Sequence, residues 1–214
     1  MPEASGSPAR AQGCDTRVAG VVLAAGASTR MGRNKLLFVL EGSTVLRRAV
    51  SRAAEAGLDP VVVVLGHEAD RARRELGGLP SEIVLNPSYQ KGINSSLGIG
   101  ISALPENVAA AVVMLADMPF VTSEMLAALA ERFRRGTAPL VISDYEGVNA
   151  PPMLYSRSLF GELLAMTGEG AGRDVVRRHR SEATIVSWPA SALSDLDRPQ
   201  DYERVRKQLE MPDR

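Results

Sequence analysis

The chain has 214 residues, 45% of them hydrophobic, and its 25 basic residues balance 25 acidic residues. This length and apolar content suit one globular domain with a sizeable core, and the zero net charge argues against a nucleic-acid binder that relies on overall positive charge. Cys14 is the only cysteine, which excludes an intrachain disulfide and a metal site built from several cysteines.

The first residues are rich in Ala, Gly, Ser and Pro and contain no apolar signal-peptide core. We therefore expect a disordered tail over residues 1–16 and a single domain over residues 17–210. No apolar run approaches the ~20 residues that a membrane span requires. These features predict a cytoplasmic protein with neither a membrane nor a nucleic acid as its partner.

A glycine-rich stretch follows the first predicted strand and reads LAAGASTRMGRNK from Leu23 onward. Gly26 and Gly32 permit a close approach of the backbone to a ligand, and inward-facing amides bind anions. Arg30 and Lys35 add two cations suited to phosphate oxygens. The spacing differs from both the P-loop and the dinucleotide-binding motifs. We expect a loop that binds a polyphosphate by another arrangement, although an ordinary glycine-rich surface loop remains the alternative.

The rest of the chain alternates between segments of helical and strand-like pattern. This alternation predicts a three-layer α/β/α sandwich with a mainly parallel sheet, in which ligands lie beyond the carboxyl ends of the strands. The predicted helices cover residues 45–54, 68–76, 97–104 and 123–135, and the predicted strands cover residues 61–65, 82–85, 110–115 and 140–143.

Three aspartates are candidates for holding a divalent cation. Asp117 follows the apolar run AVVML directly, at the end of a predicted strand. Asp195 and Asp197 precede the last predicted helix, which begins at Pro199. Mg²⁺ prefers one or two carboxylates together with phosphate oxygens and water. We expect Asp117 and either Asp195 or Asp197 to bind Mg²⁺. Capping of the last helix explains the presence of Asp195 and Asp197 equally well.

A second polar loop begins at Asn86 and continues through Gly92, Ser95 and Ser96 into a helix. Its amides and hydroxyls are suited to reading the edge of a nucleobase, and a plain helix cap with flexible glycines is the alternative. The histidines, His67 and His179, show no metal-ligand spacing, so we expect them to be structural or exposed to solvent.

Together these motifs resemble the molybdenum-cofactor nucleotidyltransferases of the MobA-like NTP transferase family, and more broadly the glycosyltransferase-A-like nucleotidyltransferases. The family's opening motif L-A-A-G-x-S-x-R-M-G-x-x-K is matched at every fixed position, and Asp117 begins its D-x-P motif. Glu169 replaces the usual Asp of a later motif, and Arg198 replaces the usual Thr of the last one. Weaker similarities cover residues 92–97, 151–154, 168–173 and 195–199.

The resemblance implies a Rossmann-like nucleotide-diphospho-sugar transferase (GT-A-like) fold and one nucleotidyltransferase domain over residues 17–210. It also implies Mg²⁺-dependent transfer of CMP from CTP to the terminal phosphate of molybdopterin, with release of pyrophosphate. The sequence L-A-A-G, with Ala25 in third place, resembles the cytidylyl-transferring members, whereas L-A-G-G is typical of the guanylyl-transferring ones. The implied partners are CTP, a phosphate-bearing pterin acceptor and a molybdenum hydroxylase or its chaperone, and a monomer and a homodimer are both open.

The expected roles within the site follow from the motifs and the resemblance together. Arg30, Lys35 and Asp117 are the expected catalytic residues, and Asp117, Asp195 and Asp197 are the candidate metal ligands. The expected nucleotide-binding residues are Leu23, Ala24, Ala25, Gly26, Ser28, Arg30, Lys35, Asn86, Gly92, Ser95 and Ser96.

Three alternatives stay open. A guanylyltransferase or a sugar-phosphate nucleotidyltransferase would keep the fold and change the substrate. An NAD(P)H-dependent oxidoreductase acting on a heterocyclic compound is a rival of another class, against which the missing dinucleotide glycine pattern counts. A non-catalytic cofactor chaperone would need neither Asp117 nor Lys35.

Overall fold

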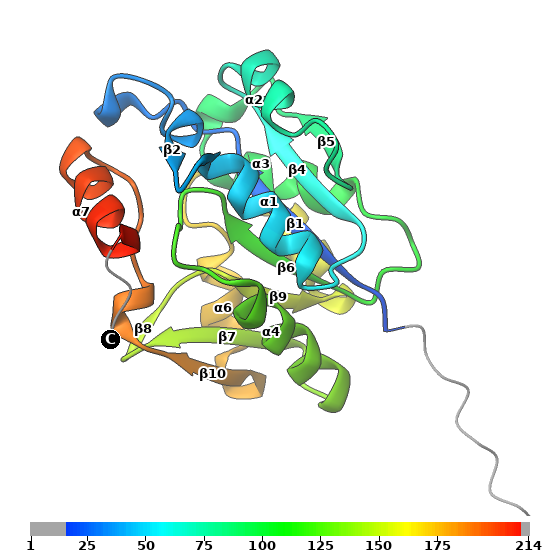
Figure 1. Cartoon of the computed structure of the whole chain (residues 1–214). Coiled ribbons are helices and arrows are strands. Elements are labelled where there is room, and N and C mark those ends of the chain that lie inside the picture. The colour runs from blue at the N-terminus through cyan, green and yellow to red at the C-terminus, as the bar shows by residue number, and fades with distance from the viewer. Residues whose placement is uncertain (1–15, 211–214) are drawn as a thin grey trace, which may run out of the picture.

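The computed structural model describes residues 16–210 (Figure 1). The predicted tail, residues 1–16, lies outside the described residues except for Thr16, and so does Cys14. Among the helices that are described, none combines the length and the apolar character needed to cross a bilayer.

One mixed sheet forms the middle layer, with the strand order β10-β7-β9-β6-β1-β4-β5 and β8 paired to β7. The strand β1 lies between β4 and β6 and runs parallel to both. This confirms the predicted three-layer, mainly parallel architecture. The strands are β1 (Val18–Ala24), β4 (Val61–Leu65), β5 (Glu82–Leu85), β6 (Ala110–Leu115), β7 (Leu140–Tyr145), β8 (Val148–Asn149), β9 (Met153–Ser156) and β10 (Thr184–Trp188).

Helices cover both faces of this sheet, which explains why all residues of β1 and β4 are buried. In Figure 1 the helices α1, α2 and α4 lie in front of the sheet, whereas α3 and α6 lie behind it. The apolar core is accordingly divided into two clusters, one on each face. The helices are α1 (Val45–Glu55), α2 (Ala69–Glu75), α3 (Ile93–Ser102), α4 (Ser123–Arg135), α5 (Phe160–Leu164), α6 (Arg173–Arg178) and α7 (Pro199–Glu210).

The strand β9 was not predicted from the sequence. It pairs antiparallel to both β6 and β7 and so reverses the strand direction inside the sheet. Its four residues, all buried, directly follow Pro151 and Pro152 and are too few to show a clear period. The two-residue strand β8 was missed for the same reason. The strand β10 was missed as well, and its residues alternate between half-buried and exposed, in contrast to the continuously buried run of β4.

A small hairpin and the C-terminal helix flank the sheet on one side. The hairpin consists of β2 (Val39–Leu40) and β3 (Ser43–Thr44). Tyr202 of α7 donates a hydrogen bond of 2.8 Å from its hydroxyl to the carbonyl oxygen of Val39, and its ring meets Phe38 edge-on at 5.0 Å. These contacts fix α7, and with it the preceding segment that carries Asp195 and Asp197, beside the glycine-rich stretch.

Candidate functional site

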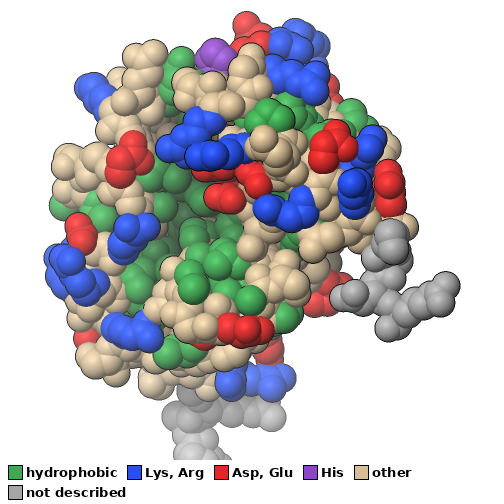
Figure 2. Space-filling view, turned by 90° about the vertical axis from the view of Figure 1, so that its left-hand side faces the viewer, with side chains coloured by type: hydrophobic (Ala, Val, Ile, Leu, Met, Phe, Trp, Pro, Cys, Tyr) green, Lys and Arg blue, Asp and Glu red, His purple; other side chains and the backbone are tan. Residues whose placement is uncertain are grey.

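The central strands bring the glycine-rich loop and Asp117 to one edge of the sheet. Leu23 of β1 lies opposite Leu115 of β6, and the amide of Ala116 donates to the carbonyl oxygen of Leu23 at 3.1 Å. Since the two strands are parallel and end at the same edge of the sheet, the loop that follows β1 starts next to the aspartate that follows β6. Figure 2 faces this edge of the sheet and shows acidic and basic side chains gathered near its middle.

The loop between Ala25 and Lys35 folds back through a short 3-10 turn, Thr29–Met31. Ser28 and Gly32, at either end of this turn, have left-handed backbones with φ of 52° and 69°. The amide of Lys35 donates to the hydroxyl of Ser28 at 3.2 Å, which closes the loop on itself. Ser28 therefore shapes the loop from within.

An ion-pair cluster lies beneath this loop. The Nζ atom of Lys35 lies 2.5 Å from Oδ2 of Asp117 and 2.9 Å from Oδ1 of Asp197. The Nη1 atom of Arg30 lies 2.7 Å from Oδ2 of Asp197. The Lys35 side chain is 15% exposed and that of Arg30 is 72% exposed, so Lys35 forms the inner part of the cluster and Arg30 the outer part.

The cluster changes the acid–base behaviour of its members. Burial by itself lowers the pKa of Lys35, but the charge of Asp117 and the hydrogen bonds that Lys35 donates to both carboxylates outweigh it, so the pKa is raised. The hydrogen bond from Lys35 lowers the pKa of Asp197, against partial burial. Partial desolvation raises the pKa of Asp195, and the nearby charges of Asp197 and Asp117 add to this effect. Lys35 therefore stays protonated at neutral pH.

Asp117 and Asp197 fit a hard divalent cation. Their oxygens already converge on one positive charge, that of Lys35. Two carboxylates completed by phosphate oxygens and water are a typical Mg²⁺ environment. Over residues 16–210 no group of three or more His, Cys, Asp or Glu residues is arranged to hold a metal alone. The donor set therefore suits a metal that is bound together with a phosphate ligand.

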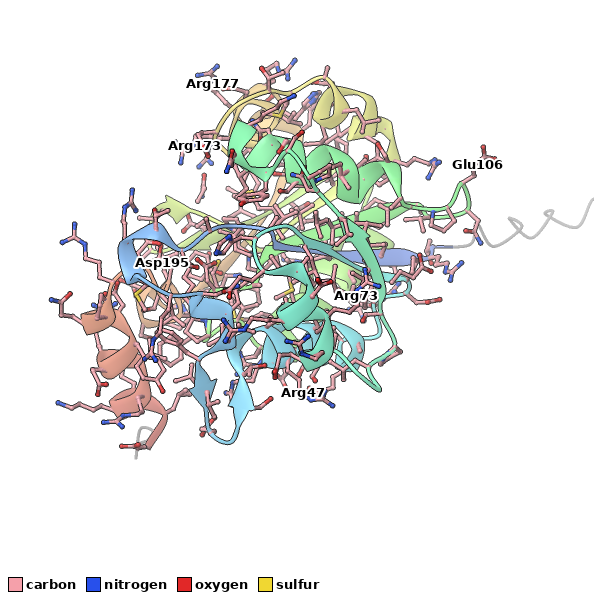
Figure 3. All side chains as sticks on the ribbon, turned by 90° about the horizontal axis from the view of Figure 1, so that it is seen from above. Arg47, Arg73, Glu106, Arg173, Arg177 and Asp195 are labelled. Atoms are coloured by element: carbon pink, nitrogen blue, oxygen red, sulfur yellow. The ribbon has the colours of Figure 1, made fainter. Side chains whose placement is uncertain are left out.

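A cleft of about 340 Å³ lies between the glycine-rich loop and the start of α3. Asp197 lines this cleft, whereas Asp195, two residues earlier, does not. Figure 3 shows Asp195 beside the segment that follows β1, and Leu196 between the two aspartates is fully buried and anchors them. Eleven of the site residues predicted from the sequence line the cleft: Leu23, Ala24, Ala25, Gly26, Ser28, Arg30, Lys35, Gly92, Ser96, Asp117 and Asp197.

Asn86 and Ser95 lie behind the wall of the cleft. Asn86 is 1% exposed, and its Nδ2 atom donates to the hydroxyls of Ser95 and Ser96 at 2.9 Å each. Its Oδ1 atom accepts from the amide of Ser88 at 2.9 Å. These bonds hold the turn before α3, so Asn86 positions the cleft wall and does not contribute a surface to it.

Several residues of the cleft were not predicted, among them Tyr89 and Gln90 in the turn before α3. Tyr89 packs against Gly66, where an added Cβ would lie 2.9 Å from its ring and 2.8 Å from the carbonyl oxygen of Ala25. The methyl group of Ala25 also faces Gly66 and is almost fully buried. Gly66 thus allows the segment after β4 to pack against the cleft wall. In the sequence, the only indication of this packing was the pair Gly66-His67 directly after a buried strand. The other unpredicted residues that line the cleft are Thr29, Leu36, Ile93, Leu115 and Glu169.

A loop over residues 167–172 covers the N-terminus of α3. Asn94, 1% exposed, donates to the carbonyl oxygens of Thr167 and Glu169 at 2.9 and 3.0 Å and accepts from the amide of Gly172 at 3.3 Å. The Glu169 carboxylate accepts from the amide of Ile93 at 3.5 Å. The loop is therefore fixed to α3, and Glu169 reaches the cleft from it.

Two proteins of known name are similar to this chain in sequence. The chain is 28% identical to the purine catabolism protein PucB of Bacillus subtilis (strain 168) over 205 residues, which cover 89% of this chain and 96% of PucB. It is 33% identical to the bifunctional protein GlmU of Rhodococcus opacus (strain B4) over 145 residues, which cover 64% of this chain but 29% of GlmU.

Among solved structures, Rv0371c of Mycobacterium tuberculosis H37Rv superposes with a TM-score of 0.81 at 26% identity, covering 90% of this chain and 99% of that one. A second structure of Rv0371c is a complex with manganese, with a TM-score of 0.74. The model of the MobA-like NTP transferase domain matches residues 20–183, which is most of the chain. The chain therefore belongs to the MobA-like NTP transferase family, and its class of activity is nucleotidyl transfer.

Proposed function

We propose that the protein transfers CMP from CTP to the phosphate of a molybdopterin-type acceptor and releases pyrophosphate. The observation that carries this proposal is the convergence of Lys35, Asp117 and Asp197 beneath a glycine-rich loop at the carboxyl ends of β1 and β6. Such a site suits a polyphosphate and a divalent cation.

The nucleotide is expected to lie in the 340 Å³ cleft, with its triphosphate against the loop 25–35. Arg30 and Lys35 neutralise the charge of the phosphates and of the departing pyrophosphate. Asp117 and Asp197 would hold Mg²⁺ there, which when bound supplies charge neutralisation at the phosphate oxygens. The structure of Rv0371c in complex with manganese supports the use of a divalent cation.

In the reaction an oxygen of the acceptor phosphate attacks the α-phosphorus of CTP. The new P–O bond forms as the bond between the α-phosphorus and the bridging oxygen breaks, and pyrophosphate leaves with that electron pair. A phosphate monoester has a second pKa near ~6, so it is largely dianionic at neutral pH and needs no general base. Positioning and charge stabilisation then supply the rate.

The choice of CTP rests on the resemblance of the L-A-A-G sequence to cytidylyl-transferring proteins. GTP and sugar-phosphate acceptors fit the same family and are the alternatives. The direct test is calorimetric binding of CTP, GTP, ATP and UTP with Mg²⁺, followed by pyrophosphate release in the presence of molybdenum cofactor. Preferential, Mg²⁺-dependent binding of CTP and cofactor-dependent pyrophosphate release are expected. A preference for GTP would assign the sister activity, and NTP binding without cofactor-dependent release would assign another acceptor.

A further inference from the structure

A second hollow, with a volume of about 530 Å³, opens next to the nucleotide cleft. It lies between α6 and the segment 149–153, and it shares Ile93 and Leu115 with the cleft. Figure 2 shows a recess floored by hydrophobic side chains beside the charged cluster, with Lys and Arg side chains around its rim. We call this the arginine hollow, because the residues that line it include Arg173, Arg177 and Arg180 and no carboxylate.

The floor of the arginine hollow is apolar. Ile93, Leu115, Pro151, Met153 and Val176 line it. Such a surface, with few polar groups, favours the face of a planar ring system over a hydrated sugar or an extended polar chain.

Two of the three arginines come from one face of α6. Arg173 and Arg177 are four residues apart, so their side chains lie on the same side of the helix, and Figure 3 shows both at the periphery of the molecule. Within residues 16–210 Arg173 makes no ion pair, and Arg177 pairs with the exposed carboxylate of Asp174 at 3.0 Å. An exposed ion pair of this kind contributes little to stability, so an anionic ligand can replace the Asp174 carboxylate at Arg177 at a small cost in free energy.

Arg180 is fixed at the opposite wall. Its guanidinium donates to Oδ1 of Asn149, and the Nδ2 atom of Asn149 in turn donates to Asp144 at 2.8 Å. The amide oxygen that Arg180 contacts is neutral, so the positive charge of the guanidinium is not cancelled by this bond. The three cations therefore surround an apolar floor without compensating charges on its lining.

The arginine hollow is held in a constant position relative to the nucleotide cleft. Gly172, which precedes α6, has φ of 87°, and a Cβ there would lie 2.6 Å from the hydroxyl of Tyr155. Its amide donates to Asn94 of α3 at 3.3 Å. The start of α6 is thus packed directly on the sheet and bonded to the helix that forms the cleft wall, so a ligand can contact both cavities at once.

We propose that the arginine hollow is the acceptor subsite, and that it selects a planar ring system carrying an anionic group separate from the phosphate that reacts. This inference rests on the proposed function. The reacting phosphate must lie near Asp117, which follows Leu115 by two residues, at the border between the two cavities. Because the three arginines line the hollow and not the nucleotide cleft, they would meet a different part of the acceptor. Their planar forks suit a carboxylate-like or other multi-oxygen anion.

The test compares two fluorescent probes that differ in one charge, pterin and pterin-6-carboxylate. Each is titrated against the full chain without nucleotide. We expect the carboxylate to bind about tenfold more tightly than pterin, and the double variant Arg173→Gln/Arg177→Gln to abolish that difference. The matched control is Arg178→Gln, on the same helix, because Arg178 pairs with Glu162 at 3.0 Å and does not line the hollow.

Equal binding of the two probes, no saturable binding of pterin-6-carboxylate, or an equal loss in Arg178→Gln would overturn the proposal. Circular dichroism of each variant verifies the fold. Calorimetric CTP binding with Mg²⁺ separates this inference from the proposed function, since it is expected to be unchanged in the arginine variants. Wild-type protein that binds the anionic probe through Arg173 and Arg177 but no NTP would refute the proposed function and leave the anionic subsite standing.

Discussion

The ammonium group of Lys35 lies 2.5 Å from the carboxylate of Asp117, with both side chains about 15% exposed. The two residues belong to different β-α units and meet only because β1 and β6 are neighbours in the sheet. A cation is thus already bound where the proposed mechanism places a metal. The ammonium group of Lys35 and a bound metal would therefore compete for the same carboxylates.

The variant Asp117→Asn removes one negative charge and keeps the size of the side chain. We expect pyrophosphate release to fall by about three orders of magnitude, since a metal ligand that stabilises developing charge contributes several kcal/mol to the barrier. Steady-state pyrophosphate assays measure this, with Asp70→Asn in the first turn of α2 as the control. Near-normal turnover of Asp117→Asn would remove this residue from the site.

The variant Lys35→Gln leaves Asp117 and Asp197 without their shared cation. We expect Mn²⁺ to bind about tenfold more tightly in the absence of nucleotide, because the metal no longer displaces the ammonium group, while the rate of nucleotidyl transfer falls. Electron paramagnetic resonance of free Mn²⁺ gives the affinity. Lys91→Gln, which alters an exposed lysine outside the cleft, is the control. Unchanged or weaker Mn²⁺ binding would show that the two carboxylates do not form the metal site.

Asn94 joins α3 to the loop 167–172 through three hydrogen bonds while 1% exposed. In Asn94→Ala the loop carbonyls and the amide of Gly172 lose their partners, and each unsatisfied buried group costs about 1–3 kcal/mol. We expect the free energy of unfolding to fall by about 2–4 kcal/mol in total, because water reaches part of the loop. Urea unfolding followed by the fluorescence of Trp188 measures this. Asn107→Ala, at an exposed site, should change it by less than about 0.5 kcal/mol.

His179 provides a pH-dependent contribution to stability. The hydrogen bond to Glu162 at 2.7 Å raises the pKa of His179, and desolvation opposes this only in part. A raised folded-state pKa means that the stabilisation is complete below the unfolded pKa of about 6.5 and is lost as the pH rises through the folded value. We expect His179→Gln to destabilise the protein by about 1 kcal/mol at pH 5.5 and by clearly less at pH 9.

Urea titrations at the two pH values measure the difference. The same substitution in a Glu162→Gln background should depend less on pH, since the main partner that raises the pKa is gone and only the weaker contact with Glu182 at 3.4 Å remains. A destabilisation by His179→Gln that is equal at both pH values would mean that His179 acts through packing alone.

Much of the fold could be predicted from local pattern. The β-branched run Val61–Leu65 is a fully buried strand, and Thr122 accepts from the amide of Met125 at the start of α4, as its position before an amphipathic segment indicates. The antiparallel strand β9 could not be predicted, because four buried residues after two prolines carry no period and their partners lie far away in the chain.

The candidate site likewise has a part that could be predicted from local sequence and a part that could not. The glycine-rich loop and Asp117 were predicted because each follows its own strand directly. Nothing local indicated that Asn86 supports the cleft from behind, or that Tyr89 and Gln90 line it, since these placements depend on how the turn before α3 packs against Gly66.

The sequence by itself determined where β1, β4, β5, β6 and β7 lie, where the chain turns after the central strands β1 and β6, and therefore that the glycine-rich loop and Asp117 reach the carboxyl edge of the sheet. This information is local, because periodicity and glycine positions act over a few residues. Only the tertiary structure decided that β6 pairs with β1, that α7 docks on the hairpin and brings Asp197 rather than Asp195 to Lys35, and that α6 sets its arginines around an apolar floor. Those outcomes depend on contacts between segments far apart in the chain, which no local pattern encodes.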